Sequence, residues 1–185
     1  CGKFRLYGIK DRSISWFLSF LTGRSQQVKV GNSVSKKAMI SMGCPQGSIL
    51  SPLLFLIYIS DIDLWVRDAT VHGFADDTST SVCSSDIREI AKRLESTANQ
   101  ILRFMASNYL SANANKTGLL IIRSGRAEGR LSINVGDSKI EESDNHRVLG
   151  LIINNKLGWN DHVYGGGGLL QSINQRVGIL KRITG

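Results

Sequence analysis

The chain has 185 residues, of which 42% are hydrophobic, and this suits one folded domain or part of a larger one. No apolar run approaches the roughly 20 residues that a helix needs to span a bilayer, which excludes a membrane-spanning helix and predicts a soluble, intracellular chain without a signal peptide. The net charge of +8 favours a negatively charged partner.

The positive charge is concentrated in the first forty residues, which hold eight Lys and Arg residues but a single acid, Asp11. Such a basic segment is typical of proteins that contact nucleic-acid phosphates, because each contact releases counterions. The alternative is a basic surface that serves only solubility. The candidate phosphate contacts in this segment are Arg24, Lys29, Lys36 and Lys37.

The cysteines and histidines form no metal-binding motif. Cys1, Cys44 and Cys83 are far apart in the sequence and lack a CxxC spacing, so they predict neither a disulfide framework nor a zinc site. The three histidines form no HxxH or HxxxH pair. A reducing compartment fits this pattern best.

The N-terminal part of the chain predicts a helix followed by a hairpin. Apolar residues at helical spacing predict the helix over residues 13–21, and Gly23 ends it. Alternating valines then predict a basic hairpin, with strands over residues 24–30 and 34–42 and a turn at residues 31–32.

A loop of small residues, 43–50, precedes a strongly apolar segment. Ser51 suits the N-cap of a helix and Pro52 its first position, because proline needs no N–H donor there. The helix predicted over residues 53–64 is apolar almost all round, so we expect it to be buried. On the residues alone, the loop either starts a buried helix or forms a surface for a nucleotide base, a sugar or a template strand.

Two adjacent carboxylates, Asp76 and Asp77, lie between two β-branched runs. The runs over residues 71–74 and 78–82 have strand propensity, and the acids suit a tight turn, so we predict a hairpin with both acids at its tip. Paired strands would hold the carboxylates together, and Mg²⁺ or Mn²⁺ relieves their repulsion most readily. An ordinary solvated surface turn is the alternative.

A long helix follows the acidic hairpin. Asp86 suits its N-cap, in a capping box with Glu89, and an apolar stripe at helical spacing continues to about residue 107. We expect the stripe to face the core. Its members are Ile87, Ile90, Leu94, Ala98, Ile101, Leu102 and Met105.

The last third of the chain predicts short strands and a final helix. Strands are expected over residues 118–122, 131–135, 138–141 and 147–153, the last turning at Asn154-Asn155. The final helix, over residues 169–183, has an apolar stripe opposite three basic residues, which suits contact with a nucleic-acid backbone. These basic residues are Arg176, Lys181 and Arg182.

Two stretches together resemble motifs B and C of the reverse transcriptases. The first reads GCPQGSILSPLLF over residues 43–55, and the second reads GFADDT over residues 73–78. Their amino-acid sequences resemble those of reverse transcriptases from non-LTR, LINE-type retrotransposons, jockey-like elements among them. The likeness extends from about residue 6 to residue 182. Residues 115–117 resemble motif D, and residues 147–162 resemble the primer-grip region, with Asn155 where an acid is more usual.

The resemblance implies RNA-directed DNA synthesis, in which a primer 3′-hydroxyl attacks the α-phosphate of a deoxynucleotide beside two Mg²⁺ or Mn²⁺ ions, roughly 3.5–4 Å apart. It implies that Asp76 and Asp77 hold metal, with Asp76 the stronger ligand, and that Lys116 protonates the leaving pyrophosphate. The residues implied to contact the nucleotide and template are Pro45, Gln46, Gly47, Ser48, Phe74 and Ala75. We expect Gln46 and the acids to border one cleft.

The fold that the resemblance implies is α+β, a partial polymerase palm in which helices cover an antiparallel sheet, with part of the fingers and the start of the thumb. Residues 1–164 would form fingers and palm, and residues 165–185 a glycine-rich hinge and the start of the thumb helix. The run of glycines at 165–168 has no counterpart in the family pattern. The implied partners are an RNA template, a DNA primer and a dNTP, in the nucleus, the cytoplasm or both, without a membrane.

A two-metal site needs a carboxylate from a second strand. In the family this acid belongs to motif A, which would lie just before residue 1, in a missing N-terminal part of the same polyprotein. We therefore expect a fragment that is inactive alone. Two alternatives stay open. A nucleic-acid-binding remnant would keep salt-sensitive affinity for primer-template without catalysis, and an inert fragment of a decayed element would show neither.

Overall fold

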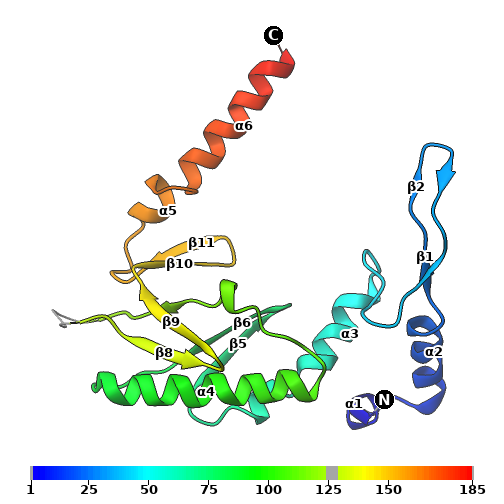
Figure 1. The fold of residues 1–185 in the computed structure, drawn as a ribbon, viewed down its shortest axis with the longest axis horizontal. Coiled ribbons are helices and arrows are strands. Elements are labelled where there is room, and N and C mark those ends of the chain that lie inside the picture. Colours follow the sequence, from blue (N-terminus) through cyan, green and yellow to red (C-terminus); the bar gives the residue numbers. More distant parts are fainter. Residues whose placement is uncertain (1, 124–128, 185) are drawn as a thin grey trace. The chain divides into compact units, whose positions relative to one another are not determined.

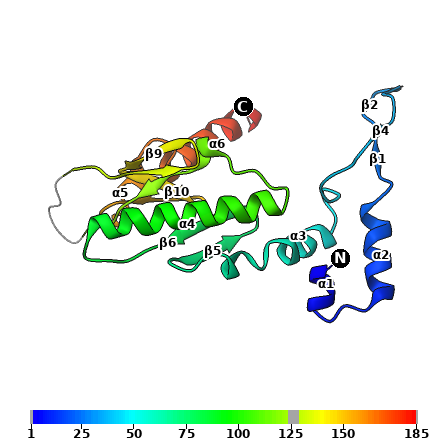
Figure 2. The same ribbon diagram turned by 60° about the horizontal axis from the view of Figure 1, so that its bottom comes forward.

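The computed structural model describes residues 2–123 and 129–184, in which the chain forms two compact units. Unit 1 comprises Cys1–Trp65 and Thr70–Thr80, and unit 2 comprises Val66–Ala69 and Ser81–Gly185. Both contain helices and small sheets, which confirms the mixed α+β class (Figures 1 and 2). Within the described ranges, no helix has the length and apolar character needed to cross a membrane.

Unit 1 begins with short helices and a narrow, interrupted hairpin. Its helices are α1 (Gly2–Leu6), α2 (Asp11–Leu21), α3 (Leu50–Ile59) and the 3₁₀ helix η1 (Ile62–Leu64). The predicted basic hairpin is confirmed, because β1 (Ser25–Gln26) pairs antiparallel with β4 (Ala38–Met39), and β2 (Lys29–Val30) with β3 (Ser33–Val34). The predicted first helix is α2, which begins two residues earlier than expected, at Asp11.

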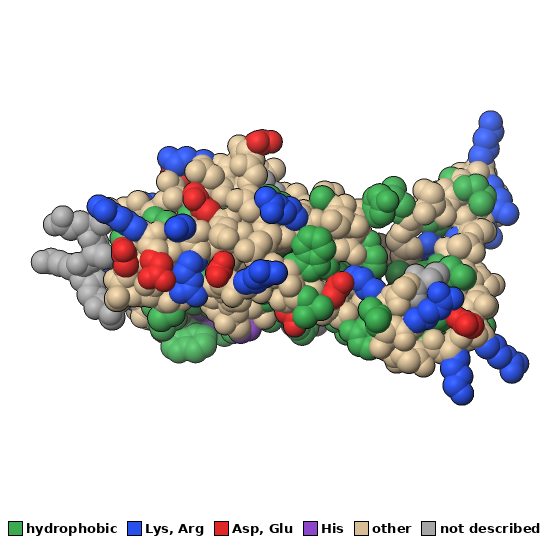
Figure 3. Space-filling view, turned by 90° about the horizontal axis from the view of Figure 1, so that it is seen from below, with side chains coloured by type: hydrophobic (Ala, Val, Ile, Leu, Met, Phe, Trp, Pro, Cys, Tyr) green, Lys and Arg blue, Asp and Glu red, His purple; other side chains and the backbone are tan. Residues whose placement is uncertain are grey.

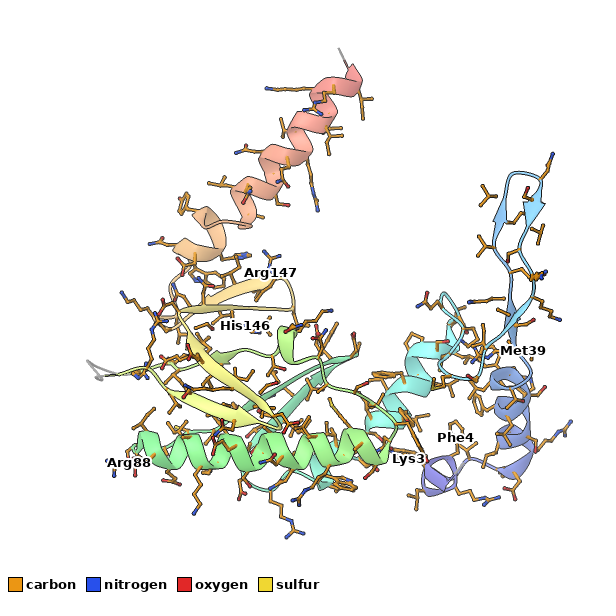
Figure 4. The ribbon with its side chains drawn as sticks, viewed as in Figure 1. Lys3, Phe4, Met39, Arg88, His146 and Arg147 are labelled. Carbon is orange, nitrogen blue, oxygen red and sulfur yellow. The ribbon has the colours of Figure 1, made fainter. Side chains whose placement is uncertain are left out.

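Side chains of residues 3–7 join this end of the chain to α2 and to the residues that follow α3. The rings of Phe4 and Phe17 stack with centroids 5.0 Å apart. Lys3 Nζ lies 2.6 Å from Asp61 Oδ1, and the Tyr7 hydroxyl bonds to Ser60 Oγ at 2.6 Å. Lys3 and Phe4 are labelled on α1 in Figure 4. These contacts tie the N-terminus of the described chain to the segment that follows α3.

The prediction of a long, buried helix over residues 53–64 was wrong in three respects. Helix α3 ends at Ile59, most of its residues are half-buried rather than buried, and Leu53 and Leu56 are each 50% exposed. Its N-cap is Ile49 rather than Ser51, which lies inside the helix. An apolar helix is buried only where other elements pack against it, and its own sequence does not specify them. Within unit 1 the main neighbour of α3 is the five-residue helix α1.

Unit 2 is built on a long helix, α4 (Ile87–Ser107), that lies against a three-stranded sheet (Figures 1 and 2). The strands β7 (Leu119–Leu120), β8 (Ser132–Val135) and β9 (Ser138–Ser143) lie in the order β7-β9-β8. The strands predicted over residues 131–135 and 138–141 form the antiparallel β8–β9 pair, whereas β7 and β9 are parallel. The buried centre of this layer consists of Leu119, Ile121 and Ile133, against which Ile90, Ala91 and Leu94 of α4 pack.

The predicted N-cap of α4 is confirmed, but the capping box is not. Asp86 Oδ1 accepts a hydrogen bond from the Arg88 N–H at 2.9 Å, whereas Glu89 accepts from the Ser84 hydroxyl instead of turning back to residue 86. The most buried side chains of the helix are Thr97 and Phe104, each 1% exposed. The stripe predicted from apolar residues omitted both, although Ile90 and Leu94 do pack on the core.

Thr97 carries a buried hydroxyl that has no hydrogen-bond partner among the described residues. An unsatisfied buried polar group is destabilising, and a shape-matched apolar group removes that penalty. We therefore expect Thr97→Val to raise the free energy of unfolding by about 1 kcal/mol in urea titration. Thr97→Ser, which keeps the hydroxyl but loses the methyl, should lower it. A Val variant less stable than the unmodified chain would contradict this.

The single strand predicted over residues 147–153 was wrong, because the segment forms a hairpin. Strands β10 (Asn145–Val148) and β11 (Leu151–Asn154) pair antiparallel. Their two-residue turn places Leu149 at φ 50° and Gly150 at φ 86°. Positive φ at both central residues matches the twist of a two-residue hairpin, and glycine adopts it without strain. The apolar run masked this turn in the sequence.

The glycine run separates α5 (Asn160–Tyr164) from the predicted last helix, α6 (Leu169–Thr184). A Cβ atom at Gly165 would clash with the Asp161 carbonyl oxygen, and one at Gly168 would lie 2.6 Å from the His162 carbonyl oxygen. Arg147, labelled in Figure 4, also donates to the Gly167 carbonyl at 2.7 Å. The run therefore has a steric role in a close turn, while its role as a hinge stays a prediction.

Candidate active site

The adjacent acids lie where a hairpin reverses direction. Strand β5 (Thr70–Phe74) pairs with β6 (Asp77–Ser81), so Ala75 and Asp76 form the connection and Asp77 opens the second strand. Ala75 has φ 52°, in the left-handed region. A two-residue connection favours such backbone angles, although the Cβ atom of any residue other than glycine makes them costly. The predicted hairpin is thereby confirmed.

Both carboxylates are exposed. Among the described residues, the side chains of Asp76 and Asp77 form no hydrogen bond and no ion pair. Two neighbouring anions without a counter-charge repel each other, and a hard cation offsets that repulsion. The pair thus has the donor chemistry that suits Mg²⁺ or Mn²⁺. In the ranges that the structure describes, no group of at least three His, Cys, Asp or Glu side chains could hold a metal ion.

The loop before α3 contains a tight turn over residues 45–48. The Ser48 N–H donates to the Pro45 carbonyl at 3.3 Å, and Gly47 has φ 80° at the third position of the turn. A positive φ at this position defines a type II turn and explains why glycine stands there. Gln46 and Gly47 are exposed at the tip of the turn, while Pro45 and Ser48 are half-buried. The turn therefore presents the Gln46 side chain to solvent.

Two side chains, for which the sequence predicted other roles, hold this loop. The Ser51 hydroxyl donates to the Pro45 carbonyl at 2.6 Å, so it anchors the turn instead of capping the helix. Arg24 donates from Nε to the Leu21 carbonyl at 2.8 Å and from Nη2 to the Gly43 carbonyl. The Ser-Pro step was the available signal for Ser51. For Arg24, the expected contact with nucleic acid stays a prediction.

Apart from the half-buried Arg24, the predicted phosphate contacts are exposed in both units. On the β2–β3 end of the hairpin, Lys29, Lys36 and Lys37 are exposed, and residues 24–42 contain no acid. On α6, Arg176, Lys181 and Arg182 are exposed beside a stripe whose members are 41–59% exposed, namely Leu170, Ile173, Val177 and Leu180. By contrast, the face of unit 2 drawn in Figure 3 intersperses basic with acidic side chains. A uniformly basic surface therefore occurs on the hairpin.

Lys116 ends a single turn of 3₁₀ helix, η2 (Ala114–Lys116), and its side chain is exposed. Asn113 orders this turn. Its carbonyl accepts from the Lys116 N–H at 3.0 Å, and its side chain accepts from the Asn115 N–H at 3.1 Å. Lys116 belongs to unit 2 and the acidic hairpin to unit 1, so their meeting at one nucleotide stays a prediction.

The structure groups some of the predicted site residues. Phe74, Ala75 and the two acids share one hairpin, and residues 45–48 share one turn. Both groups belong to unit 1. A common cleft for Gln46 and the acids stays a prediction.

Comparison with known proteins places these features in a family. Residues 3–153 match the family described as reverse transcriptase (RNA-dependent DNA polymerase). The chain is 25% identical over 154 residues to the RNA-directed DNA polymerase from mobile element jockey of Drosophila melanogaster, and 22% identical over 151 residues to the probable RNA-directed DNA polymerase from transposon X-element of the same species. Each alignment covers 78% of this chain and 16% of the relative.

A third similar protein is the probable RNA-directed DNA polymerase from transposon BS of Drosophila melanogaster. It is 29% identical over 106 residues, which cover 54% of this chain and 12% of that protein. No solved structure matches. The chain thus spans about one sixth of the length of the first two relatives. Since the family match covers most of the sequence, the chain belongs to the reverse transcriptase (RNA-dependent DNA polymerase) family.

Proposed function

We propose that this chain is the part of a non-LTR retrotransposon reverse transcriptase that carries the nucleotide-binding turn and two of the catalytic carboxylates. The observation that supports this most strongly is the exposed Asp76–Asp77 pair at a hairpin connection, in a chain whose family synthesises DNA on RNA. The substrates are an RNA template, a DNA primer and a dNTP. The place of action is the nucleus, the cytoplasm or both.

In this proposal the two carboxylates are metal ligands. Asp76 is the stronger ligand, and Asp77 lies nearer the primer end. The family generally uses divalent metal ions, and two Mg²⁺ or Mn²⁺ ions would lower the cost of charge on the attacking and leaving oxygens. The protein holds the carboxylates in place through the paired strands β5 and β6.

The turn over residues 45–48 contributes a surface for the nucleotide and template. Gly47 leaves room for close approach, and Gln46 offers an amide with both a donor and an acceptor. Phe74 is 65% exposed beside the acids and can contact a sugar or a base. Lys116 would supply the proton that the leaving pyrophosphate takes up.

A third carboxylate is needed on a second strand, because a pair from one hairpin supplies only part of the coordination sphere of two metal ions. We place it upstream of residue 1, in the N-terminal part of the same polyprotein. Residues 1–164 then belong to fingers and palm, and α6 begins the thumb. Within this chain, Asp61 and Asp11 are already paired, with Lys3 and Arg5 respectively.

Binding of nucleic acid by the basic hairpin is the part of the proposal that can be tested with the 185-residue chain alone. Changing Lys29, Lys36 and Lys37 together to Gln should weaken affinity for an RNA–DNA duplex. It should also reduce the slope of log affinity against log salt by roughly 0.7–0.9 for each phosphate that the hairpin no longer neutralises. Fluorescence anisotropy with a labelled duplex between about 50 and 200 mM salt measures both quantities.

The matched control removes the same charge from α4, by changing Arg88, Lys92 and Arg103 to Gln. All three side chains are exposed on that helix, and Figure 4 labels Arg88 at its N-terminal end. The control variant should have a salt slope closer to that of the unmodified chain than the hairpin variant has. Equal losses in both triple variants, or an affinity that does not change with salt, would contradict a specific role for the hairpin.

A further inference from the structure

Arg93 on α4 connects two segments of unit 2 that are far apart in the sequence. Its Nε and Nη2 atoms donate to the Asp68 carbonyl oxygen at 3.1 and 2.7 Å. Its Nη1 atom donates to the Cys83 carbonyl oxygen at 3.1 Å. One guanidinium therefore holds two backbone carbonyls that are 15 residues apart (83 − 68).

These carbonyls flank the acidic hairpin. Asp68 lies two residues before β5 begins, and Cys83 lies two residues after β6 ends. The chain between them includes both strands and the Asp76–Asp77 pair. Arg93 thus fixes the two ends of the segment that carries the proposed metal ligands.

The neighbours of Arg93 reinforce this arrangement. Glu89, one turn earlier on α4, lies 3.6 Å from Arg93 Nη1 and accepts from the Ser84 hydroxyl at 2.6 Å. Further along the helix, Gln100 Oε1 accepts from the Arg67 N–H at 3.0 Å. The helix therefore binds residues 67–68, which precede the hairpin, through Arg93 and Gln100, and residues 83–84, which follow it, through Arg93 and Glu89.

The geometry needs arginine in particular. The planar guanidinium presents several N–H donors in a fixed fork, so it can serve both carbonyls at once. A lysine keeps the positive charge but has one compact ammonium group at the end of a flexible stem. Replacement by Lys therefore separates the effect of the two-carbonyl bridge from the effect of charge.

We infer that Arg93 is a positioning residue for the catalytic hairpin, an inference that rests on the proposed function. By fixing residues 68 and 83, it restricts the conformations that residues 69–82 can adopt. Without the bridge the ends of this segment separate more easily, and the carboxylates at the connection lose a fixed position. A displacement of about 1 Å at a catalytic group can cost on the order of a hundredfold in rate.

Hydrogen exchange on the 185-residue chain tests the bridge without any need for activity. In Arg93→Lys and Arg93→Met, amides of residues 70–82 should exchange about 10- to 100-fold faster, because hydrogen bonds from a charged donor are removed. Amides of the β7-β9-β8 sheet should keep their rates. Arg103→Lys, an exposed control on the same helix, should match the unmodified chain. Unchanged exchange at residues 70–82, or equal acceleration in the sheet, would overturn the bridge.

Kinetics of an upstream-extended, active protein test the positioning role. Arg93→Lys should lower kcat for RNA-templated primer extension about 10- to 100-fold, with the KM for dNTP within about twofold of the unmodified value. A variant with unchanged kcat would overturn the role in catalysis. Failure of the unmodified extended protein to extend the primer would count against the proposed function instead, while the exchange experiment still decides whether the bridge exists.

Discussion

Asp76→Asn should abolish RNA-templated primer extension in a protein extended upstream of residue 1. The change keeps the size of the side chain but removes the charge that attracts a divalent cation. Loss of several kcal/mol of transition-state stabilisation corresponds to a fall in kcat of about 10³-fold. Steady-state incorporation of labelled dNTP with Mg²⁺, and separately with Mn²⁺, measures the effect.

Asp137→Asn is the matched control for this experiment. Asp137 is exposed in the turn between β8 and β9, so its replacement removes one surface carboxylate without touching the β5–β6 hairpin. This control should keep kcat within about twofold of the unmodified protein. An Asp76→Asn variant that retained a tenth or more of the activity would rule out Asp76 as a principal metal ligand.

The second large effect concerns stability. Glu142→Gln should lower the free energy of unfolding by about 2–3 kcal/mol, because it breaks an ion pair whose carboxylate side is buried. The Glu142 side chain is 4% exposed and Arg123 is 21% exposed. Glu142 accepts from Arg123 Nη2 at 2.6 Å and from the Leu131 N–H at 2.9 Å. The expected loss is below that of a fully buried pair because water reaches Arg123.

The same pair predicts a dependence of stability on pH. Hydrogen bonds from Arg123 lower the pKa of the Glu142 carboxyl, burial opposes the shift, and the Leu131 N–H adds to it. A carboxyl with a lowered pKa in the folded chain stabilises above its unfolded pKa, about 4.3, and that contribution is lost as pH falls through the lowered value. The stability difference between the unmodified chain and Glu142→Gln should therefore shrink below about pH 4.

Urea titrations at about pH 7 and pH 3 measure this difference, with Glu141→Gln as the control. Glu141 is the exposed neighbour on β9, where it lies 3.6 Å from Lys139, and its replacement should cost less than about 0.5 kcal/mol. Equal losses at positions 141 and 142 would show that the buried pair is not the cause.

The elements with strong local signals were predictable from the sequence. The turn at Gly31-Asn32, the acids between β-branched runs and the cap at Asp86 each determine their backbone through neighbouring residues. The hairpin of β10 and β11 was missed because Leu149 lies in a left-handed conformation that its residue type disfavours. The exposure of α3 was missed because burial depends on partners that periodicity does not identify.

In the candidate site too, features with local sequence signals were predictable and features that depend on tertiary contacts were not. The tight turn at the two acids followed from residue types that favour turns, whereas the left-handed backbone of Ala75 is one that its residue type disfavours. The bridge from Arg93 could not be predicted from the sequence, because a helical arginine with a glutamate one turn away indicates only an ordinary surface ion pair. Its bonds to the carbonyls of residues 68 and 83 depend on tertiary structure.

The most direct test of the central claim is extension of a DNA primer on an RNA template by two proteins, the 185-residue chain and a chain extended upstream of residue 1 to include a further strand with its Asp. If Asp76 and Asp77 supply only part of a two-metal site, the extended protein should incorporate dNTPs in the presence of Mg²⁺ or Mn²⁺. The short chain should be at least about a hundredfold slower. Extension by the short chain at a comparable rate, or none by the extended protein, would contradict the account.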